Sequence, residues 1–160
     1  TEEAFKAAFR ARVMPQWPST LNHSEPVMQY LVAALEAGTG AYGALRPLGE
    51  DASFETEERE IFRVLENKYA EWMAASEQGR AQLLWESQTA DFWSRFMAMP
   101  VALMMRRLAR QYGEPVVVDL LRQDPSALFM AYIEAENRIL SWPRLPVDLA
   151  ADVKKMWLGK

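Results

Sequence analysis

The chain has 160 residues, no cysteine and one histidine, and its net charge is −4. The missing cysteines exclude disulfide bonds and thiol catalysis, and they argue against a structural zinc site. A protein that binds duplex nucleic acid usually carries a basic field, so the overall charge argues against that class. Half of the residues are hydrophobic, which is ample material for a folded core.

No stretch approaches the roughly 18 consecutive apolar residues of a membrane-spanning helix. No charged segment followed by an apolar one precedes the first predicted helix, so a secretory leader is not indicated. We therefore expect a cytoplasmic protein. Because the chain begins with Thr1 rather than Met, we expect either a processed start or a domain taken from a longer protein.

Apolar residues recur every three or four positions along most of the chain, which is the period of an α-helix. Proline, glycine and N-cap signals divide this pattern into seven or eight helices. The sequence therefore predicts an all-α fold, a compact single-domain bundle over residues 1–160 that is irregular rather than a simple four-helix bundle. The predicted helices cover residues 2–14, 24–37, 54–76, 80–98, 100–112, 115–123, 125–141 and 146–158.

The stretch 54–76 is the clearest amphipathic helix, and we expect it to lie at the centre of the bundle. Leu65 and Trp72 belong to its apolar stripe, whereas its opposite face is rich in glutamate. In the helix that follows, Trp85 is expected to face inward.

The segment 38–43 matches the pattern G-x-G-x-x-G of dinucleotide-binding proteins. That interpretation requires a β-strand before the motif and a helix that opens on it. Here a helical pattern precedes the glycines and Pro47 follows closely, so no such unit is available. We expect these glycines to end the helix that begins at Ser24, and we expect no nucleotide cofactor.

Candidate catalytic and metal-binding residues are scarce. Di-iron bundles need histidines on two helices, but the one histidine, His23, lies in a predicted loop. The glutamates between residues 55 and 60 point in different directions around their helix, so they do not converge on a metal ion. We expect no metal, no cofactor and no enzymatic activity. Carboxylate-only catalysis and an oxygen-only magnesium site stay open as alternatives.

Glu136 is an unusual acid because it lies on the apolar face of its predicted helix, three residues from Ile133 and Ile139. A buried carboxylate must be ion-paired, hydrogen-bonded or protonated. Two interpretations are open: a structural ion pair with an arginine of a neighbouring helix, or a polar group at the floor of a ligand pocket.

Residues 95–110 carry the most distinctive charge pattern, because four arginines occur there with no acid between Asp91 and Glu114. Guanidinium groups suit carboxylates and phosphates, so we expect an exposed positive patch that contacts an acidic partner. The alternative is internal pairing with the glutamates of the helix 54–76. The arginines are Arg95, Arg106, Arg107 and Arg110.

Apolar residues next to these arginines complete the predicted surface. Met97 and Met99 flank Pro100, and we expect them to be exposed, because methionine often lines adaptable binding surfaces. Trp17 and Trp142 each precede a proline in a predicted loop. Such tryptophans either cap the core or anchor a partner.

The sequence favours a non-enzymatic helical protein–protein interaction module, such as an adaptor, chaperone-like factor, inhibitor or accessory domain, that uses this Arg/Met surface. One alternative is a helical domain that holds a small apolar ligand in an internal pocket with Glu136 at its floor. A weaker alternative is nucleic-acid contact through the arginines, which the local charge favours and the net charge opposes.

Overall fold

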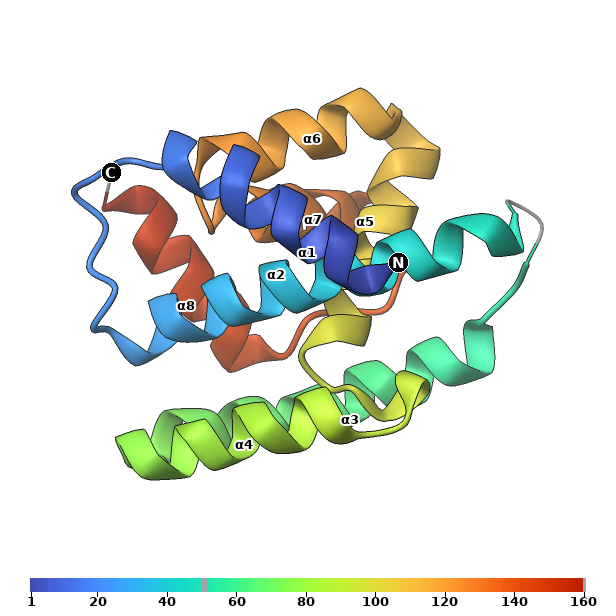
Figure 1. Ribbon diagram of the computed structural model, residues 1–160. Helices are drawn as coiled ribbons and strands as arrows, with labels where there is room; N and C mark the ends of the chain where they lie inside the picture. Colours follow the sequence, from blue (N-terminus) through green and yellow to red (C-terminus); the bar gives the residue numbers. More distant parts are fainter. Residues whose placement is uncertain (50–51, 160) are drawn as a thin grey trace.

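The computed structural model describes residues 1–49 and 52–159, and this part of the chain forms helices and no β-strand (Figure 1). The predicted all-α fold of seven or eight helices is confirmed. None of the helices in the described ranges has both the length and the apolar character needed to cross a lipid bilayer. The α-helices are α1 (Glu2–Arg12), α2 (Pro26–Leu45), α3 (Glu55–Ala74), α4 (Glu77–Thr89), α5 (Ala98–Tyr112), α6 (Glu114–Gln123), α7 (Ala127–Arg138) and α8 (Val147–Leu158).

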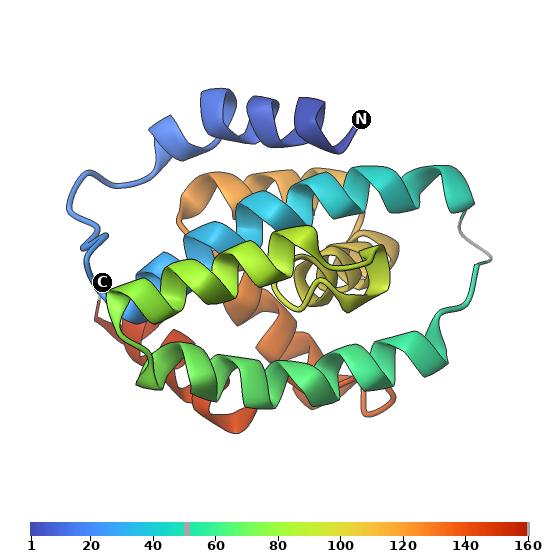
Figure 2. The ribbon, with the colours of Figure 1, turned by 60° about the horizontal axis from the view of Figure 1, so that its bottom comes forward.

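The centre of the bundle is α5, and the prediction that the helix 54–76 is central is wrong. Every residue from Ala98 to Arg106 is buried, and α2 packs extensively against this helix. In Figure 2, α5 is seen nearly end-on in the middle of the molecule, with other helices around it. The reason is amphipathicity: α3 keeps a glutamate-rich face in solvent, whereas the first turns of α5 are apolar all round.

The helices α3 and α4 form a neighbouring pair along one side of the molecule (Figure 1). Leu65 and Trp72 of α3 are buried, as the sequence predicts, with 1% and 4% of their surface exposed. The Trp72 Nε1 also donates a hydrogen bond to the carbonyl oxygen of Pro26 at 2.8 Å. Both the apolar stripe and this bond therefore hold α3 against the start of α2.

The glycines of α2 lie inside the helix, and the prediction that they end it is wrong. A Cβ atom at Gly38 would lie 2.5 Å from Val101 Cγ1 of α5, and one at Gly43 would overlap the ring of Phe5 in α1. The glycines therefore let two helices approach α2 closely. This packing offsets the cost of about 1 kcal/mol that a glycine imposes on a helix interior.

The predicted helix 80–98 ends early, at Thr89. A 3-10 turn follows over Phe92–Ser94, and α5 begins at Ala98. Trp85, which was expected to face inward, is 59% exposed. The buried residues of α4 are Leu83 and Ser87, which lie one helical turn apart. The helix therefore packs against the rest of the protein through this face, and not through the face that carries Trp85.

Candidate functional site

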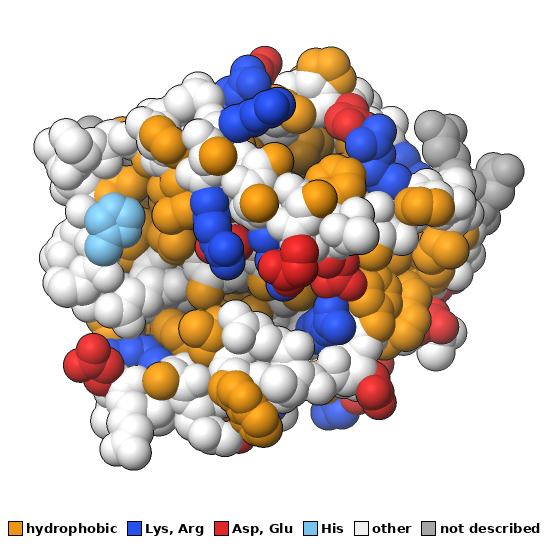
Figure 3. Space-filling model, viewed as in Figure 1, with side chains coloured by type: hydrophobic (Ala, Val, Ile, Leu, Met, Phe, Trp, Pro, Cys, Tyr) orange, Lys and Arg blue, Asp and Glu red, His pale blue; other side chains and the backbone are white. Residues whose placement is uncertain are grey.

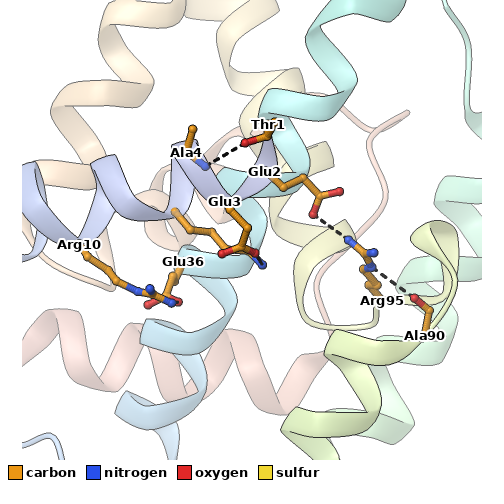
Figure 4. A network of polar contacts seen from close by, with 9 residues as sticks. Thr1, Glu2, Glu3, Ala4, Arg10, Glu36, Ala90 and Arg95 are labelled. Carbon is orange, nitrogen blue, oxygen red and sulfur yellow. Dashed lines mark hydrogen bonds and ion pairs between the residues drawn. The ribbon is translucent and has the colours of Figure 1, made fainter.

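Arg95 lies apart from the other three arginines, because it precedes α5 while they sit near its end. Its Nη1 donates to Glu2 Oε2 of α1 at 2.7 Å, and its Nε donates to the Ala90 carbonyl oxygen at 3.3 Å (Figure 4). This ion pair fastens the first turn of α1 to the segment before α5. Arg95 therefore does not share a surface with Arg110, and the prediction that the four arginines form one patch is wrong.

Arg106 is buried, with 8% of its surface exposed, so the prediction that it is an exposed contact residue is wrong. Its Nη2 donates to the carbonyl oxygens of Gly49 at 3.2 Å and Ala52 at 2.6 Å. The guanidinium also lies over the Phe54 ring, 4.5 Å from its centroid. Its side chain thus bonds to both sides of residues 50 and 51, which lie outside the described ranges. Burial, followed by the nearby charge of Arg110, lowers the pKa of Arg106.

Arg107 is partly buried in an ion pair with Glu58 of α3, which is the internal pairing that the sequence left open. Its Nε donates to Glu58 Oε2 at 3.0 Å, and its Nη2 contacts the same oxygen. Only 7% of the Glu58 side chain is exposed. The guanidinium also lies 5.7 Å from the centre of the Trp142 ring. Arg107 therefore serves mainly to hold α5 against α3 and the loop that carries Trp142.

Arg110 is exposed, and it takes part in no ion pair among the described residues. It lies one helical turn beyond Arg106, whose hydrogen bonds go to neutral carbonyl groups. No carboxylate in the part of the chain that the structure describes is ion-paired with either residue. The charge of Glu58 acts on Arg106, but Arg110 is an exposed cation that no carboxylate of the described residues pairs with.

Two surface hollows lie at this end of α5, and Arg106 and Arg110 line both of them. The larger, which we call the α2–α5 hollow, has a volume of about 430 Å³ and lies between the end of α2 and the α5–α6 junction. The smaller, the Trp142 hollow, has about 300 Å³ and lies beside the start of α3. Figure 3 shows cationic and acidic side chains gathered toward the upper right, near the α5–α6 junction.

The remaining polar groups of the α2–α5 hollow are Arg46, Glu114 and Tyr42. Arg46 Nη2 lies 3.4 Å from Glu114 Oε1, so these two charges compensate each other. Burial raises the pKa of the Tyr42 hydroxyl, which therefore stays protonated at neutral pH and can donate a hydrogen bond. The hollow thus offers guanidinium and hydroxyl donors to an anion.

Met97 and Met99 are fully buried, each with 0% of its surface exposed, so the predicted methionine surface is wrong. The Met97 N–H donates to Ser87 Oγ of α4 at 3.1 Å. On the other side, a Cβ atom at Gly38 of α2 would lie 3.3 Å from the carbonyl oxygen of Ala98. The segment around Pro100 is therefore enclosed between α4 and α2 instead of lying at an open junction.

Trp17 and Trp142 cap the core, and neither ring is an exposed anchor; each is 8% exposed. The Trp17 Nε1 donates to the Leu121 carbonyl oxygen at 2.8 Å. Trp142 stacks on Tyr132, with ring centroids 5.3 Å apart. Of the two interpretations, the structure supports core capping for both residues, although one edge of Trp142 lines the Trp142 hollow.

The polar contact of Glu136 is a hydrogen bond from the backbone, which neither interpretation predicted. It is 5% exposed, and its Oε2 accepts a hydrogen bond from the Leu145 N–H at 2.9 Å. Among the described residues it forms no ion pair with an arginine, and it lines neither of the two hollows at Arg110. Burial raises its pKa, opposed chiefly by the Leu145 hydrogen bond.

Within residues 1–49 and 52–159, no group of three or more histidine, aspartate or glutamate side chains is placed to hold a metal ion. His23 is exposed and lines a third hollow, of about 590 Å³, between α1, α2 and α4. Comparisons with known proteins give no assignment: no family model, no characterised protein and no solved structure matches the chain.

Sequence reasoning missed the α2 side of the α2–α5 hollow. Tyr42 was assigned to the glycine-rich segment after the predicted helix and Arg46 to a second loop over residues 46–53, although both belong to α2 and its 3-10 extension. One signal was present: Ala41 and Leu45 keep the four-residue apolar spacing beyond the glycines.

Proposed function

We propose that this protein is a non-enzymatic helical interaction module that binds an acidic segment of a partner protein at the end of α5. The observation that carries the proposal is the exposed guanidinium of Arg110, which forms no ion pair among the described residues. Beside it, buried Arg106 donates its hydrogen bonds to neutral carbonyl groups, and the acid whose charge acts on it, Glu58, is ion-paired with Arg107. A partner carboxylate beside Arg110 would form an ion pair with this exposed guanidinium.

The chemistry of the lining favours binding over catalysis. Guanidinium groups remain protonated at all physiological pH values, so they do not act as general acids or bases. Tyr42 is held protonated in the same way, because burial raises its pKa. We further propose that the protein acts in the cytoplasm, where a chain without cysteines loses nothing to the reducing conditions.

The two alternatives have weaker support. The three hollows described above open onto the surface, and none of the three is lined by Glu136, so none of them matches the expected internal pocket. Nucleic acid would be attracted by Arg110 but repelled by a chain of net charge −4. The test described next therefore includes an oligonucleotide, so that nucleic-acid binding would be detected.

The test uses the exposed arginine alone, because reversing buried Arg106 would unfold the protein instead of reporting on binding. The Arg110→Glu variant and a matched control, Arg122→Glu, are compared with the wild type. Arg122 is also an exposed arginine near a helix end, but it lies at the far end of α6. The probes are a fluorescent glutamate-rich peptide, its lysine-containing counterpart and a single-stranded oligonucleotide of similar length.

We expect the glutamate-rich peptide to bind, more weakly as salt is added, and the lysine peptide not to bind. Arg110→Glu should weaken binding about tenfold or more, which corresponds to roughly 1.4 kcal/mol, and Arg122→Glu should not. Equal losses in both variants would show a general charge effect. A preference for the oligonucleotide, or no peptide binding at all, would overturn the proposal.

A further inference from the structure

The third hollow, which we call the His23 hollow, has an apolar floor that solvent can reach. Val32, Ala33 and Ala37 supply this floor from one face of α2, and Leu84 adds to it from α4. All four residues are only partly buried, and all four pack against the core. In Figure 3 the one histidine lies beside apolar side chains. A ligand that covers this floor with an apolar group gains free energy by removing it from water.

The charged side chains around this floor are paired with each other. Lys6 Nζ lies 2.9 Å from Glu3 Oε1, and Arg10 forms an ion pair with Glu36 (Figure 4). The less exposed member of the first pair is the cation, Lys6, and that of the second pair is the acid, Glu36. Neither sign of charge therefore predominates in the hollow, and a charged ligand would have to compete with an existing ion pair.

The His23 hollow is short and is bridged at one end. Its α2 lining runs from Gln29 to Ala37, which corresponds to about 12 Å along the helix axis. Beyond Ala37, the ion pair of Arg95 and Glu2 joins the start of α1 to the segment after α4 (Figure 4). At the other end, His23 comes from the loop before α2. These bounds and the volume of about 590 Å³ suit a small molecule better than a helix of a partner protein.

We infer that the His23 hollow binds an uncharged small molecule that has an apolar body and a hydrogen-bonding group. The body would cover Val32, Ala33 and Leu84. The hydrogen-bonding group would meet the amide of Gln88, an exposed residue of α4 that has no hydrogen-bond partner among the described residues.

This hollow is separate from the site of the proposed function. It shares no lining residue with the two hollows at Arg110, so binding at one site does not depend on the other. It also differs from the internal pocket that the sequence suggested, because it opens onto the surface and is not lined by Glu136.

The experiment uses two fluorescent dyes that share one ring system. Phenylnaphthylamine is uncharged and has an N–H group, whereas anilinonaphthalene sulfonate carries an added anionic group. Each dye is titrated into the wild type and into two matched pairs of variants. Ala33→Phe fills the hollow, and its control, Ala44→Phe, places the same ring at an exposed position of the same helix. Gln88→Ala removes the proposed hydrogen bond, and its control is Gln82→Ala, an exposed glutamine of α4 outside the lining.

We expect the uncharged dye to bind the wild type about tenfold or more tightly than the sulfonate, because the cations of the hollow are already paired. Ala33→Phe should weaken its binding about tenfold, and Ala44→Phe should not. Gln88→Ala should weaken it about threefold, the effect of one hydrogen bond, and Gln82→Ala should not. The uncharged dye should also raise the melting temperature of the wild type, because a ligand that binds only the folded state stabilises it.

Tighter binding of the sulfonate, or no binding of the uncharged dye, would overturn this inference. Equal affinities of Ala33→Phe and Ala44→Phe would overturn it as well. If circular dichroism shows that Ala33→Phe is unfolded, the glutamine variants decide, and equal affinities of Gln88→Ala and Gln82→Ala would overturn the inference. Arg110→Glu should leave dye binding unchanged, so failure of this inference leaves the proposed function standing.

Discussion

Arg107 and Arg110 lie three residues apart on α5, yet they have different surroundings. Arg107 is held by Glu58 and by the face of Trp142, whereas Arg110 faces solvent at the rim of two hollows. The sequence pattern cannot distinguish these two environments, because they depend on where α3 and the loop that carries Trp142 pack. Of the four candidate arginines, Arg110 is thereby left as the exposed one, with buried Arg106 as its neighbour.

The Glu58–Arg107 pair leads to a prediction about stability. Replacing Glu58 with glutamine keeps the shape but removes the charge, and it leaves Arg107 partly buried beside Arg106 without a counter-charge. We expect Glu58→Gln to lower the free energy of unfolding by about 1–3 kcal/mol. Urea unfolding measures this loss. The control is Glu60→Gln, whose acid forms an exposed pair with Arg63 that should contribute less than about 1 kcal/mol. Equal small losses would contradict the structural role of Arg107.

Glu136 leads to a prediction about pH. Because burial raises its pKa in the folded protein, the folded state holds this proton more tightly than the unfolded chain does. The stabilisation from protonated Glu136 is therefore present at acid pH and is lost as pH rises through the folded pKa. Glu136→Gln stays neutral and still offers an oxygen to the Leu145 N–H.

We therefore expect Glu136→Gln to be more stable than the wild type near neutral pH and no more stable in acid, below the pKa of an unfolded glutamate. Denaturation midpoints measured across this range test the claim. A variant that is less stable than the wild type at neutral pH would show that the ionised carboxylate stabilises the fold, through the Leu145 N–H or the nearby cations.

At the scale of elements, the crossing of α2 and α5 depends on a glycine. A Cβ atom at Gly38 would overlap the Cβ and Cγ1 atoms of Val101, and the backbone fixes the position of that Cβ atom whatever the rotamer. We expect Gly38→Ala to lower the free energy of unfolding by about 1–3 kcal/mol, despite the better helix propensity of alanine. Thermal unfolding followed by circular dichroism measures the loss.

The control for this prediction is Gly40→Ala in the same helix. There the two nearest atoms belong to the flexible side chain of Lys6, at 3.0 and 3.1 Å, so the structure can adjust at smaller cost. We expect the loss at Gly40 to be clearly smaller than the loss at Gly38. The reverse order would mean that α1, rather than α5, sets the tightest contact with α2.

The existence of the helices could be predicted from the sequence, but several of their ends could not. Periodic apolar spacing identifies α3 and α8 because this spacing depends only on residues within the same helix. The glycines of α2 mislead because their role, close contact with Val101 and Phe5, depends on helices elsewhere in the chain. The break after Thr89 was missed for the same reason, because Ser87 of α4 binds the Met97 N–H and stabilises a non-helical segment.

At the scale of the whole molecule, the candidate site could be predicted only in part. An arginine-rich stretch without acids marks the region of α5, since that property is local in the sequence. The partners that neutralise Arg95 and Arg107, namely Glu2 and Glu58, lie 93 and 49 residues away in the chain. The α2 side of the α2–α5 hollow, with Tyr42 and Arg46, also comes from a distant part of the chain. Neither these acids nor this side of the hollow can be predicted from the spacing around Arg110.

The last prediction concerns how the molecule unfolds. The buried apolar residues form one continuous cluster that includes Leu65 of α3, Leu103 of α5 and Leu149 of α8. We therefore expect a single cooperative unfolding transition. Leu65→Ala and Leu149→Ala should each cost about 2–5 kcal/mol and shift the midpoint in urea without changing the slope. Circular dichroism and tryptophan fluorescence should report the same curve for each protein. Because Leu65 and Leu149 belong to helices far apart in the chain, two separate transitions, one sensitive to each variant, would show that the α3–α4 pair folds independently and that the common core does not govern stability.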